Sequence, residues 1–511
     1  MDDISNNRRI AKNTLLLYFR MLVQMLVSLY TSRVVLSTLG IADFGIYNVV
    51  GGVVAMFSFI NNAMASSSQR YLTFELGRGN HSRLHSAFCT SVNIHLLISI
   101  IILFFSQTIG LWFLNSYMVI PVARFDAAIW VFQMSVLSTV FAMLAIPFIA
   151  TIVAHEKMSA FAYISIFEVL MKLVIVYILW VSEIDKLKLY SILMFCVQLL
   201  VCLIYRTYCK KNFAECKYEL IYDKQLFREM SGFASWNLWG SMSAVAFTQG
   251  LNILLNLFFG PVVNAARAIA VQVQNAIQGF VSNFQMAINP QITKKYAMGD
   301  MEQMHSLVFA SGRYSFFLLF LFALPIFIEI NPVLVFWLGI VPDHTVGFVR
   351  LILCIMLVDT LANPLIVAAQ ATGRIKVYQS VVGGLLLLIV PVAYVVLKMG
   401  GDPESVFWVH FIVAVLAQLV RLLMIRPMIG LSLRRYFFEV IMKVVTVAIV
   451  SSAFPFLLHG VLSEGFFAFL LVCVVSFCSV LSTIFMLGLS GRERKLVVEK
   501  LFLLRQKVIR R

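Results

Sequence analysis

Arginine and glutamine side chains recur along one line of an apolar stretch in the middle of the chain. At about 100° per residue of an α-helix, Arg267, Gln274, Gln278 and Gln285 fall within about 20° of one line. Long polar side chains on one stripe of an apolar helix are typical of the wall of a hydrated cavity. Hydrogen bonding between packed helices is the alternative. The pattern favours a cavity wall that binds polar or anionic groups.

Further polar groups stand in other apolar stretches. Arg20 and Gln24 are four residues apart and share one face of the first stretch, which predicts a cavity position or a side chain that reaches back to the membrane surface. Asn237 lies on one face of the stretch 231–258 with further hydroxyl-bearing residues. Arg313 lies about two turns into the stretch 307–330. We expect Arg20, Gln24, Asn237 and Arg313 to line the same cavity.

One carboxylate is predicted near the middle of the membrane. Asp359 is followed one turn later by Asn363 and then by Pro364, which frees a backbone carbonyl. A carboxylate beside a helix break is typical of a proton or cation site. A structural salt bridge to Arg267 or Arg313 is the alternative.

Glu168 and Lys172 have the i, i+4 spacing of a pair that neutralises its own charge. This spacing favours a structural pair, with a substrate or proton role in the cavity as the alternative. The membrane interior stays net positive after this pairing, because arginines outnumber the remaining carboxylates there. A basic cavity suits an anionic ligand, and arginine suits phosphate through its bidentate fork. A cavity for cationic drugs would be expected to be acidic.

The elements that position these residues are predicted to be membrane helices. Of the 511 residues, 61% are apolar and 13% charged, with a net charge of +16. This composition excludes a soluble core and a nucleic-acid-binding domain. Since a span takes about 20 residues, the chain is predicted to be an all-α polytopic membrane protein. Fourteen apolar stretches are candidates: 12–38, 44–66, 86–114, 125–153, 160–181, 188–208, 231–258, 263–290, 307–330, 347–370, 376–398, 404–425, 438–459 and 466–489.

The positive charges predict the orientation. Most of the 40 lysines and arginines lie in connections on one side, and the other side holds only Arg124, Lys186, Lys188, Arg350 and Lys398. The positive-inside rule therefore places both termini in the cytoplasm.

An internal repeat divides the chain. A shift of 220 or 217 positions aligns residues at equivalent places of two six-span segments. The aligned pairs are Gly40/Gly260, Thr73/Thr293, Gly79/Gly299, His85/His305, Pro147/Pro364, Ala154/Ala371 and Lys157/Arg374. An even number of spans gives a parallel repeat about an axis along the membrane normal. We expect a six-helix bundle at 1–209, a cytoplasmic linker at 210–230, a second bundle at 231–430, and two further helices with a basic tail at 431–511.

Catalytic and metal-binding patterns are missing. The eight cysteines form no CxxC pair, and no Cys/His cluster has metal-ligand spacing. There is no phosphate-cradling loop with its lysine. The sequence therefore predicts no enzyme, no metal and no cofactor.

Several features together resemble a known family. They are the two six-span segments, the turn Leu39-Gly40-Ile41-Ala42-Asp43-Phe44-Gly45-Ile46-Tyr47, and Pro147 followed by Ala154-His155-Glu156-Lys157. The chain resembles the multidrug/oligosaccharidyl-lipid/polysaccharide exporter (MOP) superfamily, and most of all the Wzx-type flippases of its polysaccharide branch. The resemblance covers essentially the whole chain.

The resemblance implies a transport function. It implies a flippase that moves undecaprenyl-pyrophosphate-linked oligosaccharides from the cytoplasmic to the periplasmic leaflet of the bacterial inner membrane by alternating access. The product would supply O-antigen, capsule or exopolysaccharide synthesis. Arg20 and Arg267 match cavity arginines of related lipid flippases. The chain would act as a monomer, in contact with membrane lipid and alongside polysaccharide polymerase or assembly proteins, with no nucleic acid. Transport would be coupled to an H⁺ or Na⁺ gradient or to the membrane potential.

Two alternatives stay open. One is a cation-coupled multidrug antiporter of the same superfamily, and the other is a non-transporting membrane scaffold of a polysaccharide-assembly complex.

Overall fold

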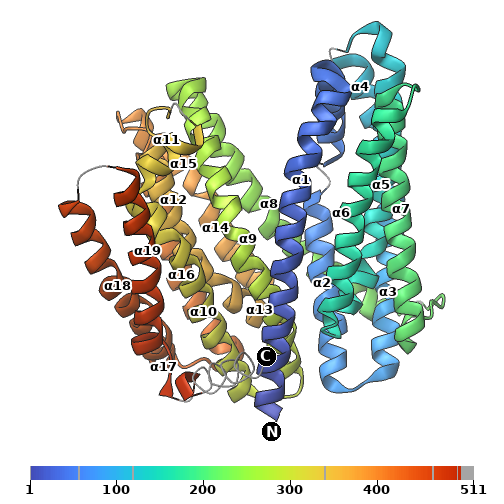
Figure 1. The fold of residues 1–511 in the computed structure, drawn as a ribbon. Coiled ribbons are helices and arrows are strands. Elements are labelled where there is room, and N and C mark those ends of the chain that lie inside the picture. Colours follow the sequence, from blue (N-terminus) through green and yellow to red (C-terminus); the bar gives the residue numbers. More distant parts are fainter. Residues whose placement is uncertain are drawn as a thin grey trace, which may run out of the picture. The chain divides into compact units, whose positions relative to one another are not determined.

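The structure is a computed structural model, and it describes residues 2–55, 58–117, 120–221, 223–338, 341–462, 465–491 and 493–495. The described residues form helices and connecting turns (Figure 1). The first seven helices are α1 (Asp2–Ala55), α2 (Ser58–Arg78), α3 (His81–Phe105), α4 (Leu111–Tyr117), α5 (Phe125–Ala154), α6 (Met158–Val181) and α7 (Lys186–Asn212). The next six are α8 (Lys224–Phe259), α9 (Pro261–Ala297), α10 (Met301–Ile328), α11 (Ile330–Leu338), α12 (Thr345–Thr360) and α13 (Ala362–Thr372). The last six are α14 (Lys376–Leu387), α15 (Ile389–Lys398), α16 (Ser405–Ile429), α17 (Leu433–Tyr436), α18 (Met442–Val461) and α19 (Phe466–Thr483).

Eleven helical segments of the described residues are long and apolar enough to cross a membrane. The chain is therefore a polytopic helical membrane protein. Three of the predicted stretches are not among the eleven. The stretch 12–38 contains only a shorter apolar helix, Asn13–Ser28, while 44–66 is divided between α1 and α2. The third, 263–290, lies in the 37-residue α9, which is long enough but too polar.

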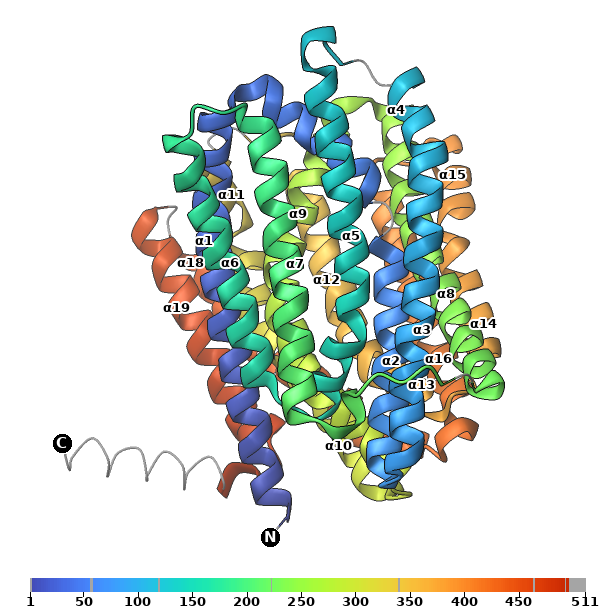
Figure 2. The ribbon, with the colours of Figure 1, turned by 90° about the vertical axis from the view of Figure 1, so that its right-hand side faces the viewer.

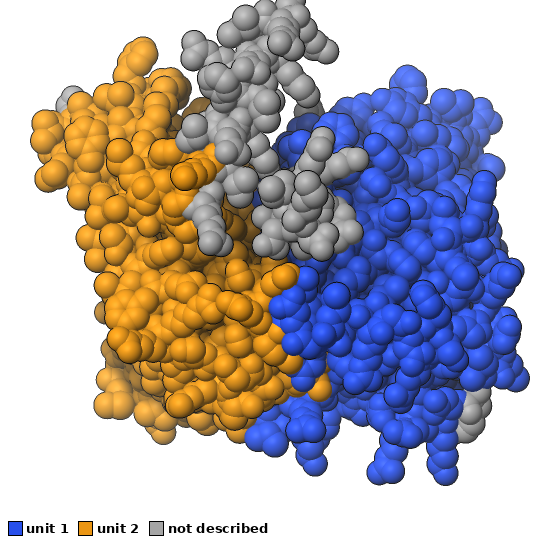
Figure 3. All heavy atoms as spheres, turned by 90° about the horizontal axis from the view of Figure 1, so that it is seen from below, with its two compact units in different colours: residues 1–242, 286–300, 373–380 blue, residues 243–285, 301–372, 381–511 orange. Residues whose placement is uncertain are grey.

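The chain divides into two compact units (Figure 3). Unit 1 comprises residues 1–242, 286–300 and 373–380, and unit 2 comprises residues 243–285, 301–372 and 381–511. Unit 1 thus contains α1 to α7 together with one end each of α8, α9 and α14.

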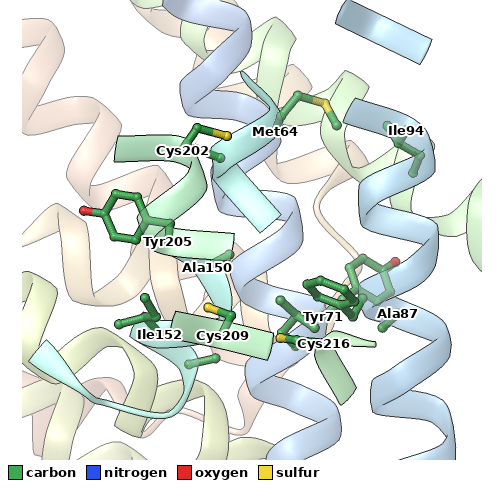
Figure 4. Close-up of a cluster of buried hydrophobic side chains, with 14 of the residues drawn as sticks. Met64, Tyr71, Ala87, Ile94, Ala150, Ile152, Cys202, Tyr205, Cys209 and Cys216 are labelled. Carbon is green, nitrogen blue, oxygen red and sulfur yellow. The ribbon is translucent and has the colours of Figure 1, made fainter. Parts of the chain in front are cut away.

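Within unit 1, α5 packs against α7, α2, α3 and α1 (Figure 2). The hydrophobic core of unit 1 consists of apolar residues of α2, α3, α5 and α7 and of the segment that follows α7. Met64, Phe88, Ile152 and Tyr205 are buried there, and Cys216 of the short 3₁₀-helix η3 (Ala214–Cys216) covers the end of the core (Figure 4).

Within unit 2, α12 packs against α10 and α16, and α19 packs against α10 and α18. Phe348 and Ile355 of α12 are buried with Phe407 of α16 and Leu319 of α10. This packing leaves α12 and α13 among the most enclosed helices of the unit.

The backbone repeats its left-handed turns at the predicted offsets. Gly40 and Gly260 have φ of 78° and 80°, and Gly79 and Gly299 have φ of 69° and 77°. The third pair is Glu156, with φ of 58°, and Gly373, with φ of 76°. Glycine is the residue that adopts this region without strain. The internal repeat seen in the sequence is thus a repeat of backbone conformation as well.

The two repeat-related prolines differ in their effect. The helix containing Pro364 is interrupted at Leu361, which separates α12 from α13. The helix α5 continues through Pro147, and Thr151 Oγ1 donates a hydrogen bond of 2.8 Å to the Pro147 carbonyl. This is the local bond of a hydroxyl to the carbonyl one turn earlier in the same helix.

Candidate functional site

One face of α9 is exposed and polar. Its exposed residues between 261 and 297 include Gln272, Asn275 and Ser282, with the small residues Ala268 and Ala276. At about 100° per residue, positions 268, 272, 275 and 282 lie within about 80° of arc. They therefore form one stripe along α9, which we call the α9 polar stripe.

This stripe differs from the lipid-facing surfaces of the chain. The helix α19 exposes Phe466, Phe467, Leu470 and Val474, as a helix in contact with hydrocarbon does. The described residues of α9 between 261 and 297 expose no large apolar side chain. Since uncompensated amides are costly in hydrocarbon, the α9 polar stripe suits a hydrated environment better than a lipid-facing one.

The predicted stripe lies on a different side of α9. Arg267 and Ala268 are adjacent, so the two stripes are about 100° apart around the helix. Arg267 is only 5% exposed, and its Nη2 donates a hydrogen bond of 3.0 Å to the Thr248 carbonyl of α8. Gln274 and Gln278, which belong to the predicted stripe, are half-buried. The expected cavity wall thus turns out to be partly a packing surface.

Gln285 connects α9 to the helix break of α12 and α13. Its Nε2 donates to Ser315 Oγ of α10 at 3.1 Å and to the Thr360 carbonyl at 3.5 Å. Thr360 is the last residue of α12 and directly follows Asp359. The buried end of the predicted stripe is therefore packed next to the predicted ion site.

Asp359 is the one exposed residue between Thr345 and Thr372, all of which the structure describes. A lipid-facing helix would expose an apolar stripe, whereas this segment exposes a single carboxylate. No carboxylate–cation contact within 4.0 Å involves Asp359 among the described residues. Asp359 is thus a surface carboxylate on an otherwise enclosed pair of helices.

The groups around Asp359 are polar. Asn363, one turn further along, is half-buried, and its Oδ1 has no hydrogen-bond partner among the described residues. Arg421 of α16 is buried and acts electrostatically on Asp359, while its Nη1 donates to Gln418 Oε1 at 2.6 Å. Neither arginine that the sequence proposed as a partner is bound to Asp359. Arg313 instead pairs with Glu493 at 3.0 Å.

A second charged group lies within unit 1. Arg20 of α1 is half-buried, with its guanidinium carbon 4.6 Å from the centroid of the Phe161 ring on α6. Glu168 acts on it electrostatically, and Lys172 Nζ is 2.5 Å from Glu168 Oε1. Gln24 is half-buried one turn after Arg20. The i, i+4 pair is therefore formed, and it lies beside Arg20.

Asn237 is not on an exposed surface. It is 5% exposed, and its Oδ1 accepts a hydrogen bond of 3.2 Å from Gln379 Nε2 of α14. Gly240 lies beside the same glutamine, since a Cβ there would be 2.4 Å from Gln379 Oε1 and would displace the end of that side chain. In this structure Asn237 therefore joins α8 to α14.

A buried carboxylate joins three elements at the predicted cytoplasmic end of unit 1. Glu156, in the turn between α5 and α6, accepts a hydrogen bond of 2.7 Å from Lys294 Nζ and another from Gln291 Nε2, both on α9. Its backbone carbonyl accepts a hydrogen bond of 3.2 Å from Asn13 Nδ2 of α1. We call these four residues the Glu156 latch.

The repeat-related turn makes the reciprocal contact. Arg70 of α2 packs against Gly373, where a Cβ would lie 2.7 Å from Arg70 Nη2. The 220-residue shift places Arg70 at position 290, next to Gln291. The 217-residue shift places Glu156 at Gly373. The Arg70–Gly373 contact is therefore close to the repeat equivalent of the Gln291–Glu156 contact. The contact between α2 and α9 joins equivalent residues too, because a Cβ on Gly77 would lie 2.8 Å from Ala297 Cβ.

Sequence reasoning missed the α9 polar stripe and the Glu156 latch. The stripe contains small residues at two positions, and the pattern of long polar side chains in the sequence did not single it out. Glu156 was visible only as part of the exit from the α5 region. The signal in the sequence was that Glu156 occupies the position whose repeat partner, Gly373, is a glycine.

Comparison with known proteins identifies the fold. No protein-family model and no curated protein matches the sequence. An outward-facing multidrug resistance MATE family transporter of the MOP superfamily is similar in structure, with a TM-score of 0.71 over 83% of this chain and 96% of that chain, at 12% identity. The MATE transporter ClbM in complex with Rb⁺ gives a TM-score of 0.67 at 16% identity, over 84% of this chain and 97% of that chain.

A third structure is a MOP superfamily transporter from Pyrococcus furiosus, described as having a binding pocket of reverse polarity. It has a TM-score of 0.68 at 12% identity, over 83% of this chain and 96% of that chain. The chain therefore has the fold of MATE transporters of the MOP superfamily.

Proposed function

We propose that the protein is a flippase that moves undecaprenyl-pyrophosphate-linked oligosaccharides across the bacterial inner membrane by alternating access, with both termini in the cytoplasm. The observation that supports this proposal best is the α9 polar stripe. Its amide and hydroxyl groups are uncharged and exposed. Such groups exchange hydrogen bonds with sugar hydroxyls at little desolvation cost, whereas an apolar drug would prefer aromatic walls.

The anionic part of the substrate needs a cation. Arg20 is the candidate that is not fully buried, and its guanidinium lies over the Phe161 ring; a guanidinium binds phosphate oxygens through its fork of N–H donors. Arg267 is 5% exposed and Arg313 is 6% exposed, so either reaches a pyrophosphate only after a rearrangement. The proposed phosphate contact therefore rests first on Arg20.

Alternating access assigns a role to the Glu156 latch. The latch ties the ends of α1 and α9 to the turn between α5 and α6. Entry of a substrate headgroup from the predicted cytoplasmic side requires these elements to separate. We propose that latch opening precedes substrate entry and that Asp359 couples the cycle to an ion gradient.

The experiment replaces Gln272 and Asn275 together by leucine in cells that depend on the chain for surface polysaccharide. The expected result is loss of surface polysaccharide at unchanged protein level, because leucine removes the hydrogen-bonding groups at similar volume. Gln303→Leu is the control, since Gln303 is exposed at the start of α10 and away from the stripe. Normal polysaccharide in the double variant would contradict the proposal.

A second candidate function has its own observation. Asp359 is an exposed carboxylate with no cation within 4.0 Å among the described residues, a feature that suits the coupling site of a cation-driven multidrug antiporter. This function predicts drug sensitivity on deletion and normal surface polysaccharide. The two measurements, made on one deletion strain, distinguish the candidates.

A further inference from the structure

A pocket of about 690 Å³ lies in unit 2, at the end of the helices that the charge distribution predicts to be periplasmic. Its walls come from the α10–α11 junction, from α12 and from the facing ends of α18 and α19. It is lined on one side by charged groups and on the other by aromatic and aliphatic ones. This amphipathic division gives the pocket a chemistry that neither the α9 polar stripe nor Asp359 has.

Three charged or titratable residues form the polar side of the pocket. Arg350 lines it and donates from Nε to the Phe327 carbonyl at 3.2 Å, which fixes the guanidinium plane. No carboxylate pairs with Arg350 within 4.0 Å in the described part of the chain. His459 Nδ1 is bonded to Glu329 Oε1 at 2.8 Å, and the Glu329 side chain is only 5% exposed. Arg350 Nη groups and His459 Nε2 therefore remain for a ligand.

The apolar side has the properties of a membrane interface. Phe336 of α11 is 87% exposed and Phe466 of α19 is 63% exposed, and both line the pocket. Trp337, beside Phe336, is 48% exposed. Aromatic residues gather where spans leave the hydrocarbon and meet lipid headgroups. Hydrocarbon chains can therefore lie against Phe336 and Phe466 while a headgroup reaches Arg350.

The charge of the pocket selects the headgroup. The Glu329 carboxylate is bonded to His459, and Arg350 has no carboxylate within 4.0 Å in the described part of the chain, so Arg350 is the cation that faces an anionic headgroup. A phosphodiester brings one negative charge, whereas a pyrophosphate brings more and would leave an excess of negative charge. We propose that this pocket binds a membrane phospholipid by its phosphodiester, with Arg350 and His459 holding the phosphate and Glu329 positioning the imidazole. The site is separate from the proposed transport path and does not depend on the substrate.

The test titrates the purified full-length protein in detergent with short-chain phosphatidylglycerol and counts bound lipid by native mass spectrometry. Loss of a charge-assisted contact lowers affinity by about tenfold, and we expect this loss for Arg350→Gln. His459→Gln should give a smaller loss, and Arg350→Lys should keep part of the affinity because it keeps the charge without the fork. Lys398→Gln removes an exposed charge from the same predicted face and should change nothing.

Two further ligands make the test decisive. Short-chain diacylglycerol has the same tails without phosphate, and farnesyl pyrophosphate has an isoprenoid tail with a larger charge. The proposal is overturned if diacylglycerol binds as tightly as phosphatidylglycerol, or if Arg350→Gln binds as wild type does. It is also overturned if farnesyl pyrophosphate binds more tightly than phosphatidylglycerol in an Arg350-dependent way. If Arg350→Gln fails to fold, Arg350→Lys and His459→Gln decide the outcome by the same criteria.

Discussion

Glu156 and Lys294 form a salt bridge of 2.7 Å in which the carboxylate side chain is 1% exposed and the ammonium side chain 22% exposed. A carboxylate enclosed to this degree is stable in its charged form only with partners. Lys294, with Gln291, supplies them from α9, while Glu156 stands in the turn after α5. The pair therefore connects residues 138 positions apart in the sequence.

Removal of the lysine should open the latch. Lys294→Met leaves Glu156 buried without its cation, and breaking a buried pair in this way costs about 3–5 kcal/mol. We expect lower thermal stability in detergent and faster maleimide labelling of a cysteine placed at Ala287, which is fully buried near this end of unit 1.

The neighbouring lysine is the matched control. Lys295 contacts Asp300 at 3.5 Å, and Asp300 is 33% exposed. Lys295→Met should change stability by less than about 1 kcal/mol. Equal effects of the two substitutions on labelling would show that the latch does not close this end.

Replacement of Gly373 should strain the reciprocal contact. With φ of 76°, a side chain at this position is disfavoured by roughly 1–2 kcal/mol. Its Cβ would also lie 2.7 Å from Arg70 Nη2. Gly373→Ala should therefore lower the thermal stability in detergent by more than the cost of a side chain in the left-handed backbone region alone.

Gly299 separates the two contributions. Its φ is 77°, and a Cβ there would meet nothing within 4 Å. Gly299→Ala thus reports the backbone cost without the clash. The double variant Arg70→Ala/Gly373→Ala should regain the extra stability that Gly373→Ala loses relative to Gly299→Ala. If the effects of Arg70→Ala and Gly373→Ala on the free energy of unfolding simply add, the two residues are not in contact.

Asp359 should be needed for coupling and not for folding. Asp359→Asn keeps the volume and removes the charge, so gradient-driven transport in proteoliposomes should fall to background. Asp359→Glu should keep part of it. Asp343→Asn, an exposed change in the loop before α12, is the control. Gradient-dependent transport that persists in Asp359→Asn excludes this carboxylate as the coupling group.

The linker region should make stability depend on pH. Burial alone would raise the pKa of the Glu215 carboxyl, but hydrogen bonds, chiefly from His155 Nε2 at 2.5 Å, and nearby histidine charge hold it below its ordinary value. A depressed pKa contributes stability above the unfolded-state value of about 4.3, and this contribution is lost as pH falls through the lower folded-state value. Thermal unfolding should show this acid-side loss, and Glu215→Gln should reduce it.

The sequence predicted well what depends on composition and on short spacings. Eleven apolar membrane-length segments, the Glu168–Lys172 pair and the helix break beside Pro364 all follow from local rules. Local rules do not decide which face of a polar helix is covered. The two stripes of α9 both contain glutamine, and packing against α8, α10 and α12 determines that Arg267 and Gln285 are buried while Gln272 is exposed.

Arg313 illustrates the same limit over a longer distance. Its position within a span predicted a cavity role, but Glu493, 180 positions later, is its partner. Long-range pairing depends on how helices return toward each other, which spacing along a single helix does not encode.

The third pair of left-handed turns departs from glycine on one side only. Glu156 adopts φ of 58° where its counterpart is Gly373. The two repeat-related turns therefore make different contacts, an ion pair at Glu156 and a steric contact at Gly373. Because the Glu156 side chain is only 1% exposed, salt screens its ion pair little. Loss of a charge should therefore loosen the first turn, whereas only a change of side-chain volume should loosen the second.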